Sequence, residues 1–345
     1  MSTVRERLET AMAGGTPDKT PLGIYGWFLG DTNNLSDDAK RLVDMGLGLI
    51  VGGGTVGARS EGIEWSNEQK KEGNDTYYIH KLKTPVGELR KASKNGWHYE
   101  DWIKQPADYK VWQWMVEHTE VFPSYEGYLA MEERLGQRGL PIVGAGRTPI
   151  MEINIDIAGT ERFCMDIAME VPELLDLYEA MKKLHRKRAE IMAAGPGKII
   201  SYVENLTIGM IGPKRYSDFM VGIYNDCFPL YHAAGKLAAV HYDGEVNCIR
   251  NEIAAAPMDI MESLTEPPEG DMMYEDCRRL WPNKAFLGNI NVGLYYKTRD
   301  ELAAAVVDKR NRAGKKGLAF EVSEDMPRTW KEQIPVVLKT LEELD

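Results

Sequence analysis

The stretch Leu237–Glu245 (LAAVHYDGE) places an imidazole and a carboxylate directly after an apolar run. Such a run is typical of a buried strand, and His241, Asp243 and Gly244 follow where the strand would open into a loop. In parallel barrels, the side chains that stand at these strand ends carry out the chemistry. We therefore expect the functional site to lie at the end of this strand.

Further polar side chains stand at the ends of other predicted strands: Trp27 and Asp31, Glu204 and Asn205, Glu262, Asn289 and Asn291, and Glu321 and Glu324. A single carboxylate at such a position more often caps the next helix, and a lone histidine more often packs than binds a ligand. Several carboxylates at one mouth, however, repel one another unless a cation or a proton compensates. A divalent metal held by one imidazole and two or three carboxylates would resolve this repulsion, and zinc suits that ligand mix.

The elements that would position these residues alternate along most of the chain. Strands are predicted at residues 21–27, 47–51, 140–144, 198–203, 236–241, 259–262, 284–289 and 317–322, and helical patterns follow most of them. Eight strands are the number that closes a parallel barrel. We therefore predict an α/β fold, a TIM (β/α)8 barrel. An open doubly wound sheet stays possible, because the alternation of strands and helices does not by itself show that the sheet closes into a barrel.

An insertion interrupts this alternation between the second and third strands, at about residues 53–139. Within it, Asp75–Lys94 alternates with a period of two around Pro85-Val86-Gly87, which predicts a β-hairpin. The segment that follows is rich in tryptophan: Trp97, Trp102, Trp112 and Trp114. These rings could line a pocket for a flat ligand, although packing of a core is the more common role. We predict a single barrel domain over residues 1–345 that carries this β-hairpin and helical insertion.

The composition indicates a globular protein and excludes several kinds of partner. Of 345 residues, 43% are hydrophobic and 28% are charged, and the net charge of −11 disfavours binding to nucleic acid or an anionic membrane. The four widely spaced cysteines indicate reduced thiols, and neither a signal peptide nor a membrane span is recognisable, so we expect a cytoplasmic location. The GGGTVG run at 52–57 matches GxGxxG, but without a following helix it indicates a flexible loop. A homodimer stays open, because nothing in the sequence shows the oligomeric state.

Short motifs occur in a characteristic order along the chain: KTPVGEL at 83–89, YVEN at 202–205, HYDG at 241–244, MESLTEPP at 261–268 with Gly270-Asp271, LGNI at 287–290 and SEDMP at 323–327. Together they resemble the uroporphyrinogen decarboxylase superfamily, and more closely its corrinoid-dependent methyltransferase branch. The resemblance covers nearly the whole chain. It implies a TIM barrel and transfer of a methyl group to or from a corrinoid carrier.

The resemblance also implies a zinc site with altered ligands. Thiol-methylating members of this family hold zinc through the histidine and cysteine of His-x-Cys and through a later cysteine. This sequence keeps His241 but has Asp243 at the cysteine position, with Glu321 or Glu324 near the later one. An oxygen-rich site leaves zinc more electrophilic and suits it to polarising a substrate oxygen. The expected reaction is therefore O-demethylation, in which the methyl group of a methoxylated aromatic passes to the cob(I)alamin of a separate corrinoid protein.

These considerations assign roles to the strand-end residues. The predicted zinc ligands are His241, Glu204 and Glu324. The predicted catalytic or supporting acid–base groups are Asp243, Glu262 and Glu321. The small-molecule methyl donor is expected to contact Trp27, Phe28, Tyr202, Tyr242 and Asn289.

Alternatives remain open at this stage. One is a metal-free decarboxylase of the same superfamily that uses Asp31 or Asp243, although residues 21–31 lack the arginines with which uroporphyrinogen decarboxylase binds its polyanionic substrate. Another is a methyltransferase that acts on methylamine, methanol or betaine. A third is a non-catalytic module that docks a methyl carrier.

Overall fold

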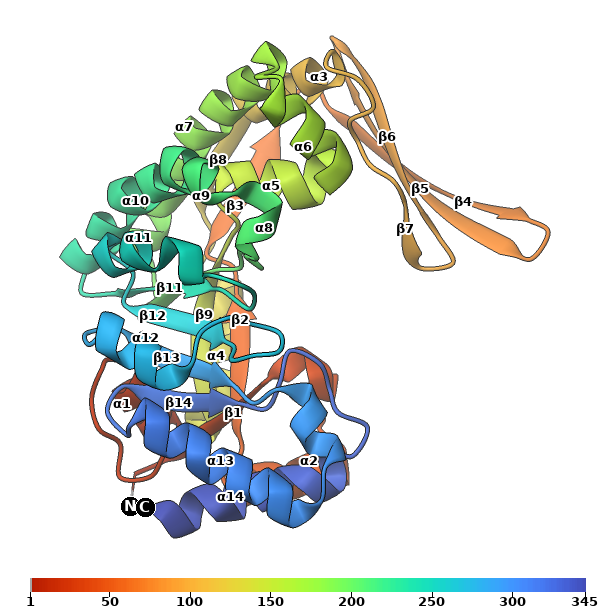
Figure 1. Ribbon diagram of the computed structural model, residues 1–345. Coiled ribbons are helices and arrows are strands. Elements are labelled where there is room, and N and C mark those ends of the chain that lie inside the picture. The colour runs from red at the N-terminus through yellow and green to blue at the C-terminus, as the bar shows by residue number, and fades with distance from the viewer. Residues whose placement is uncertain (1) are drawn as a thin grey trace. The chain divides into compact units, whose positions relative to one another are not determined.

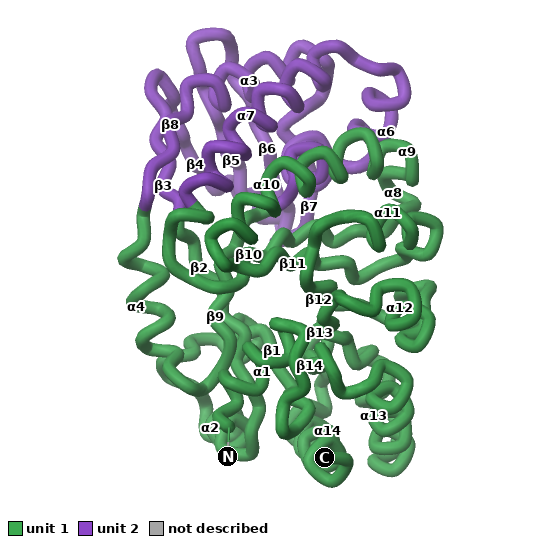
Figure 2. The backbone as a smooth tube through the Cα atoms, turned by 90° about the vertical axis from the view of Figure 1, so that its left-hand side faces the viewer, with its two compact units in different colours: residues 1–55, 124–146, 192–345 green, residues 56–123, 147–191 purple. Residues whose placement is uncertain are grey.

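The apolar runs of the sequence form a closed parallel barrel in the computed structural model, which describes residues 2–345 (Figure 1). Its strands are β1 (Leu22–Tyr25), β2 (Gly48–Gly53), β9 (Gly139–Gly146), β10 (Ile199–Tyr202), β11 (Leu237–His241), β12 (Ile260–Leu264), β13 (Ala285–Asn289) and β14 (Leu318–Glu321). They are hydrogen-bonded in the order β1-β14-β13-β12-β11-β10-β9-β2, and β2 closes the ring on β1. Figure 2 shows this ring in green. The predicted TIM barrel with eight strands is confirmed.

The inside of the barrel changes from apolar to polar along the strands. Residues early in the strands, such as Ile199, Ala239 and Ile260, share one buried cluster with side chains of the first helix, α1 (Val4–Met12). This cluster fills the end of the barrel where the strands begin. Because successive side chains of a strand alternate between its two faces, the residues two positions further along also face inward. Those residues are polar, so the barrel is apolar at one end and polar at the other.

Helices follow most of the strands, as the sequence predicts. In the compact unit that contains the barrel they include α2 (Asp37–Asp44), α4 (Glu126–Leu135), α10 (Gly222–Ala233), α11 (Arg250–Ala255), α12 (Tyr274–Leu280), α13 (Arg299–Ala313) and α14 (Trp330–Leu344). Ser36 caps α2 as predicted, because its hydroxyl accepts a hydrogen bond from the Ala39 amide. The predicted helix over 213–234 is interrupted, since the π-helical turn η4 (Tyr216–Val221) precedes α10. No helix within residues 2–345 combines the length and the apolar character that crossing a membrane requires.

Residues 56–123 and 147–191 form a second compact unit, here called unit 2, while the barrel belongs to unit 1 (Figure 2). Unit 2 contains the antiparallel pair β3 (Val56–Ser60) and β8 (Thr119–Pro123), and an antiparallel sheet of β4 (Glu64–Glu72), β5 (Asp75–Thr84), β6 (Gly87–Lys94) and β7 (Trp97–Glu100). Its helical elements are α3 (Asp108–Glu117), α5 (Pro149–Glu152), η3 (Ile153–Ala158), α6 (Thr160–Ala168) and most of α7 (Pro172–Ala194). The predicted hairpin is confirmed as β5 and β6, with Thr84 paired to Gly87 at its turn.

The boundaries of the insertion follow from the barrel pairing. β2 and β9 are neighbours in the barrel, so the chain between them leaves the barrel after its second strand and returns at its third. Unit 2 also takes residues 147–191, which come after the third strand. The single domain over residues 1–345 stays a prediction. The glycine run at 52–57, predicted as a flexible loop, is mostly strand, because β2 extends to Gly53 and β3 begins at Val56. No helix follows these glycines, as a dinucleotide-binding loop would require.

Candidate functional site

The polar end of the barrel interior carries a layer of buried side chains from five neighbouring strands: Ser201, His241, Glu262, Asn289 and Glu321. Each lies two residues beyond an apolar member of the inner cluster, so the strand pleat alone directs it inward. The layer stands at the carboxyl ends of the strands, where TIM-barrel enzymes place their active sites. This end of the barrel is therefore the candidate site.

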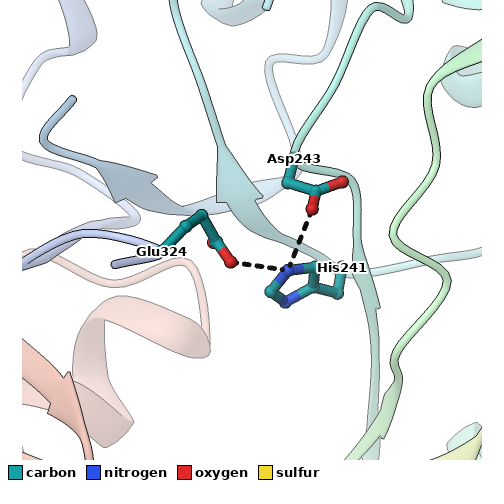
Figure 3. Close-up of side chains that lie close together, drawn as sticks. All are labelled: His241, Asp243 and Glu324. Atoms are coloured by element: carbon teal, nitrogen blue, oxygen red, sulfur yellow. Dashed lines mark ion pairs between the residues drawn. The ribbon is translucent and has the colours of Figure 1, made fainter. Parts of the chain in front are cut away.

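His241 of this layer lies beside the carboxylates of Asp243 and Glu324 (Figure 3). The imidazole Nε2 lies 3.2 Å from Oε2 of Glu324 and 3.8 Å from Oδ2 of Asp243. On the other side of the ring, Nδ1 lies 3.8 Å from Oε1 of Glu262. Burial works against a charged imidazole, but Glu262 and Glu324 outweigh it and raise the pKa of His241 well above its ordinary value. Without a bound cation, the ring is therefore an imidazolium between carboxylates.

Glu262 is held by hydrogen bonds on both carboxylate oxygens. The Tyr25 hydroxyl donates to its Oε1 at 2.8 Å, and the Ser201 hydroxyl donates to its Oε2. Burial alone would raise the pKa of Glu262, but His241 and these two hydroxyls lower it. An ionised carboxylate in this position orients the imidazole through its Nδ1 side, as the outer partners of metal-binding histidines do.

A local irregularity in β12 turns Ser263 toward the same group. Its φ of 56° lies in the left-handed region, and the pairing of β12 with β13 shifts register between Glu262 and Leu264. The Ser263 hydroxyl lies 2.5 Å from Glu321 Oε1 and also contacts Glu324. Strained conformations of this kind are concentrated at functional sites, where the surrounding structure must hold them.

The two glutamates beside Ser263 differ in their charge. Burial and repulsion from Glu324 raise the pKa of Glu321 well above its usual range, so this carboxyl holds a proton. Burial also acts to raise the pKa of Glu324, but His241 outweighs it and the pKa is lowered. The site thus holds one neutral and one ionised carboxyl next to the imidazole, a pairing that suits acid and base roles.

The group around His241 fits a divalent cation. One donor atom each from His241, Asp243 and Glu324 lies within 4.8 Å of the other two. In tetrahedral zinc sites with bonds of about 2.0–2.1 Å, neighbouring donor atoms are about 3.3 Å apart, close to the separations around Nε2. Within residues 2–345, His241 Nε2 makes no hydrogen bond of good geometry although it is buried. Three protein donors leave a position for a substrate, as in catalytic zinc sites.

Glu204, predicted as a zinc ligand, lies elsewhere in the structure. It is fully buried, and its Oε1 accepts a hydrogen bond from the Tyr224 hydroxyl at 3.0 Å. Within the described residues, the cluster of possible ligands contains Asp243 in its place. Asp243 in turn accepts a hydrogen bond from Asn205 at 3.0 Å, which orients it toward His241. The structure thus places Asp243, predicted as a catalytic group, beside His241 and Glu324 at the place expected for Glu204.

Tyr202 and Tyr242, predicted to bind the substrate, instead lie on the outer face of the barrel wall. Each is one residue out of phase with an inward-facing residue, Ser201 or His241, and is fully buried. The Tyr202 hydroxyl is 2.8 Å from that of Tyr231 on α10, and the Tyr242 hydroxyl donates to another tyrosine of α10. The pleat of β10 directs Tyr202, and the phase of His241 directs Tyr242, into the packing against helices, and their contact with a substrate stays a prediction.

The other predicted binding residues remain close to the candidate site. The Trp27 ring stacks on Tyr25 at 4.3 Å with an interplanar angle of 10°, yet 63% of this tryptophan is exposed. Phe28 is partly buried and its ring lies 5.8 Å from that of Trp27. Asn289 faces inward and donates to Thr265 at 2.9 Å, while its Oδ1 is buried without a hydrogen-bond partner in the described chain. Their role in binding stays a prediction.

The sequence analysis missed Tyr25, Ser201 and Ser263. Tyr25 and Ser201 lie in strands that are buried on both faces, LGIY and IISY, so no alternation indicates which side chains point inward. A position near the end of a strand predicts an inward-facing side chain only where a charged residue shows which face of the strand points into the barrel. Ser263 faces inward because of the register shift in β12, and no sequence pattern predicts such a shift.

Comparisons with known proteins identify the fold. No known protein family and no curated protein matches the sequence. A methyltransferase from Methanosarcina mazei has a similar structure, with 12% identity, 100% of this chain and 99% of that chain covered, and a TM-score of 0.59. A B12-independent methionine synthase from Shewanella sp. W3-18-1 is 11% identical, with 94% and 97% covered and a TM-score of 0.47. At 12% identity the likeness to the Methanosarcina mazei protein shows the fold alone, a TIM barrel, which supports many different reactions.

Proposed function

We propose that this chain is a zinc-dependent methyltransferase that cleaves a methyl ether, of a methoxylated aromatic, and transfers the methyl group to the cob(I)alamin of a separate corrinoid protein. The observation that carries the proposal is the group of His241, Asp243 and Glu324 at the carboxyl end of the barrel. A fold shared with a methyltransferase supports it further, as does the resemblance of the sequence motifs to the corrinoid-dependent branch.

The donor set explains the choice of an ether as substrate. One imidazole and two carboxylates form a hard, oxygen-rich ligand set that leaves a divalent cation electrophilic. Zinc held there supplies Lewis acidity at the ether oxygen. The leaving group is a phenolate, whose conjugate acid has a pKa of about 10, so stabilising the developing charge is the main catalytic task.

The remaining residues orient the substrate and supply the proton that the leaving oxygen needs. The exposed face of Trp27, supported by Tyr25, offers a surface on which the aromatic ring stacks. Glu321 carries a proton in the buried layer and donates it to the leaving oxygen as the methyl carbon–oxygen bond breaks, which leaves Glu321 ionised. Glu262 holds the imidazole in place through Nδ1. The cob(I)alamin of the partner protein would supply the electron pair for the new bond to the methyl carbon.

A metal-free decarboxylase is the second candidate. One observation favours it: the raised pKa of His241 allows an imidazolium to satisfy Glu262 and Glu324 without any cation. An imidazolium and a neutral carboxyl could then stabilise and protonate a carbanion formed by loss of carbon dioxide. The two candidates differ in their need for metal, which the following experiment tests.

The experiment combines purified protein, reduced cob(I)alamin and a panel of methoxylated aromatics under anaerobic conditions. We expect absorbance to report methylcobalamin with at least one donor, and we expect a chelator to abolish the reaction until zinc is returned. Methyl transfer by verified metal-free protein would overturn the zinc assignment. Absence of transfer across the panel, with zinc bound and cobalt reduced, would overturn the proposed ether substrate.

A further inference from the structure

Unit 2 contains a cavity of about 270 Å³, and none of the residues that line it belongs to the barrel site. One face of the β3–β8 pair contributes Ala58, Ser60, Thr119 and Val121, since these residues alternate along paired strands. Helices α3, α5 and α7 provide the other walls. Much of the lining is apolar, and its aromatic member is Trp112. The volume is slightly below the range of about 300–1,000 Å³ typical of ligand pockets, so an occupant must be small.

Three polar side chains of α5 and α7 interrupt this apolar lining: Glu152, His185 and Arg188. On α7, His185 and Arg188 share a face with Met181 and Leu184, because residues three, four and seven apart lie on one side of a helix. Burial, and to a lesser extent the positive charge of Arg188, lowers the pKa of His185 to about 3, so this imidazole is neutral. The cavity therefore contains one acidic and one basic group beside a neutral ring.

Glu152 and Arg188 influence each other but do not pair. Within residues 2–345, the side chain of neither residue has an ion pair within 4.0 Å or a hydrogen bond. Burial raises the pKa of Glu152, and the positive charge of Arg188 acts in the opposite direction. By contrast, Arg186, two residues before Arg188 on α7, pairs with Glu190 at 3.1 Å. Glu152 and Arg188 are both partly buried, and polar groups that lose water without gaining a partner reduce stability, so a ligand that pairs with both would remove this cost.

We propose that this cavity binds a small apolar or aromatic α-amino acid. Its carboxylate would pair with the Arg188 guanidinium, whose planar fork matches a carboxylate in two parallel hydrogen bonds. Its ammonium group would pair with Glu152, and its side chain would pack against Trp112 and the apolar face of β3 and β8. A zwitterion with an apolar side chain can pair with both charged residues and also pack against the apolar walls. An anion or a cation alone would leave one of the two charged residues without a partner.

The test measures binding by calorimetry with the full-length protein, and it needs no methyl donor or corrinoid. The probes are phenylalanine, leucine and methionine, together with 3-phenylpropionate, which lacks the ammonium group, and phenethylamine, which lacks the carboxylate. The variants are Arg188→Gln and Glu152→Gln. Lys187→Gln serves as the matched control, because Lys187 is an exposed neighbour of Arg188 on the same helix and does not line the cavity. Thermal melts confirm that each variant is folded.

We expect saturable binding of at least one amino acid and at least tenfold weaker binding of both truncated analogues. Arg188→Gln should weaken amino-acid binding at least tenfold, and Lys187→Gln should leave it unchanged. Glu152→Gln should weaken binding of the amino acid but not of 3-phenylpropionate. Failure of all three amino acids to saturate, or equal affinity for phenylalanine and 3-phenylpropionate, would overturn the proposal. Either result is independent of whether the barrel transfers methyl groups.

Discussion

The carboxyl end of the barrel and the cavity of unit 2 both bring acidic and basic side chains to a buried space, but they compensate these charges differently. At the barrel end, His241 lies between Glu262 and Glu324, and hydroxyl groups bind the carboxylates. In unit 2, Glu152 and Arg188 face the cavity without a partner. Mutual compensation fixes the geometry of a site before a ligand arrives, whereas uncompensated charges leave part of the interaction for the ligand itself.

The largest effect is expected from removing the imidazole at the barrel end. His241→Ala should abolish zinc binding and lower methyl transfer by about a thousandfold, because Lewis acidity contributes several kcal/mol and each 1.36 kcal/mol is a factor of ten. Metal analysis and the methylcobalamin assay measure the two losses together. His232→Ala is the matched control, since His232 pairs with Asp259 at 2.8 Å outside the site. Full zinc occupancy in His241→Ala would contradict the ligand assignment.

The sequence predicted the barrel and part of this site for a physical reason. Strand ends in a parallel barrel converge, so His241, Glu262 and Glu321 could be placed together without knowing any distance. The sequence shows which residues of a strand face inward only where one of them is charged. This explains why Tyr202 was assigned inward while Tyr25, in an equally apolar strand, was overlooked.

Unit 2 was less predictable. β4 (EWSNEQKKE) is exposed along its whole length and therefore lacks the apolar alternation by which strands are recognised. The cavity depends on residues of α5, α7 and the β3–β8 pair, which are distant in sequence. No local pattern connects Glu152 with Arg188, because their approach depends on how these elements pack.

The second prediction compares one glutamate from each region. Glu262→Gln should destabilise the protein by about 1–3 kcal/mol, since it removes a buried carboxylate from the Tyr25 and Ser201 hydroxyls and from the His241 imidazole. Glu152→Gln should change the free energy of unfolding by less than about 0.5 kcal/mol, because no hydrogen bond or ion pair is lost. Denaturant unfolding measures both. Similar costs for the two variants would remove the contrast between a compensated and an uncompensated site.

The smallest effect concerns the pH dependence of stability in zinc-free protein. The folded-state pKa of His241 is raised above its unfolded value of about 6.5, so its stabilising contribution is complete below that pH and is lost as the pH rises through the folded value. Each unit of pKa difference corresponds to about 1.4 kcal/mol. Melting temperatures from pH 6 to 9 should therefore fall more steeply for the wild type than for His241→Gln, which lacks the titrating group.

Zinc should reverse the sign of this dependence. A metal ion binds only the neutral imidazole, so zinc and the proton compete for His241, and stabilisation by zinc should increase with pH over the same range. The difference between zinc-loaded and zinc-free melting temperatures should consequently widen from pH 6 to 9 in the wild type and stay close to zero in His241→Gln. A constant difference in the wild type would show that zinc binds away from this imidazole. The compensated charges around His241 would then constitute a closed acid–base network, and the metal-free decarboxylase would become the better explanation of the barrel site.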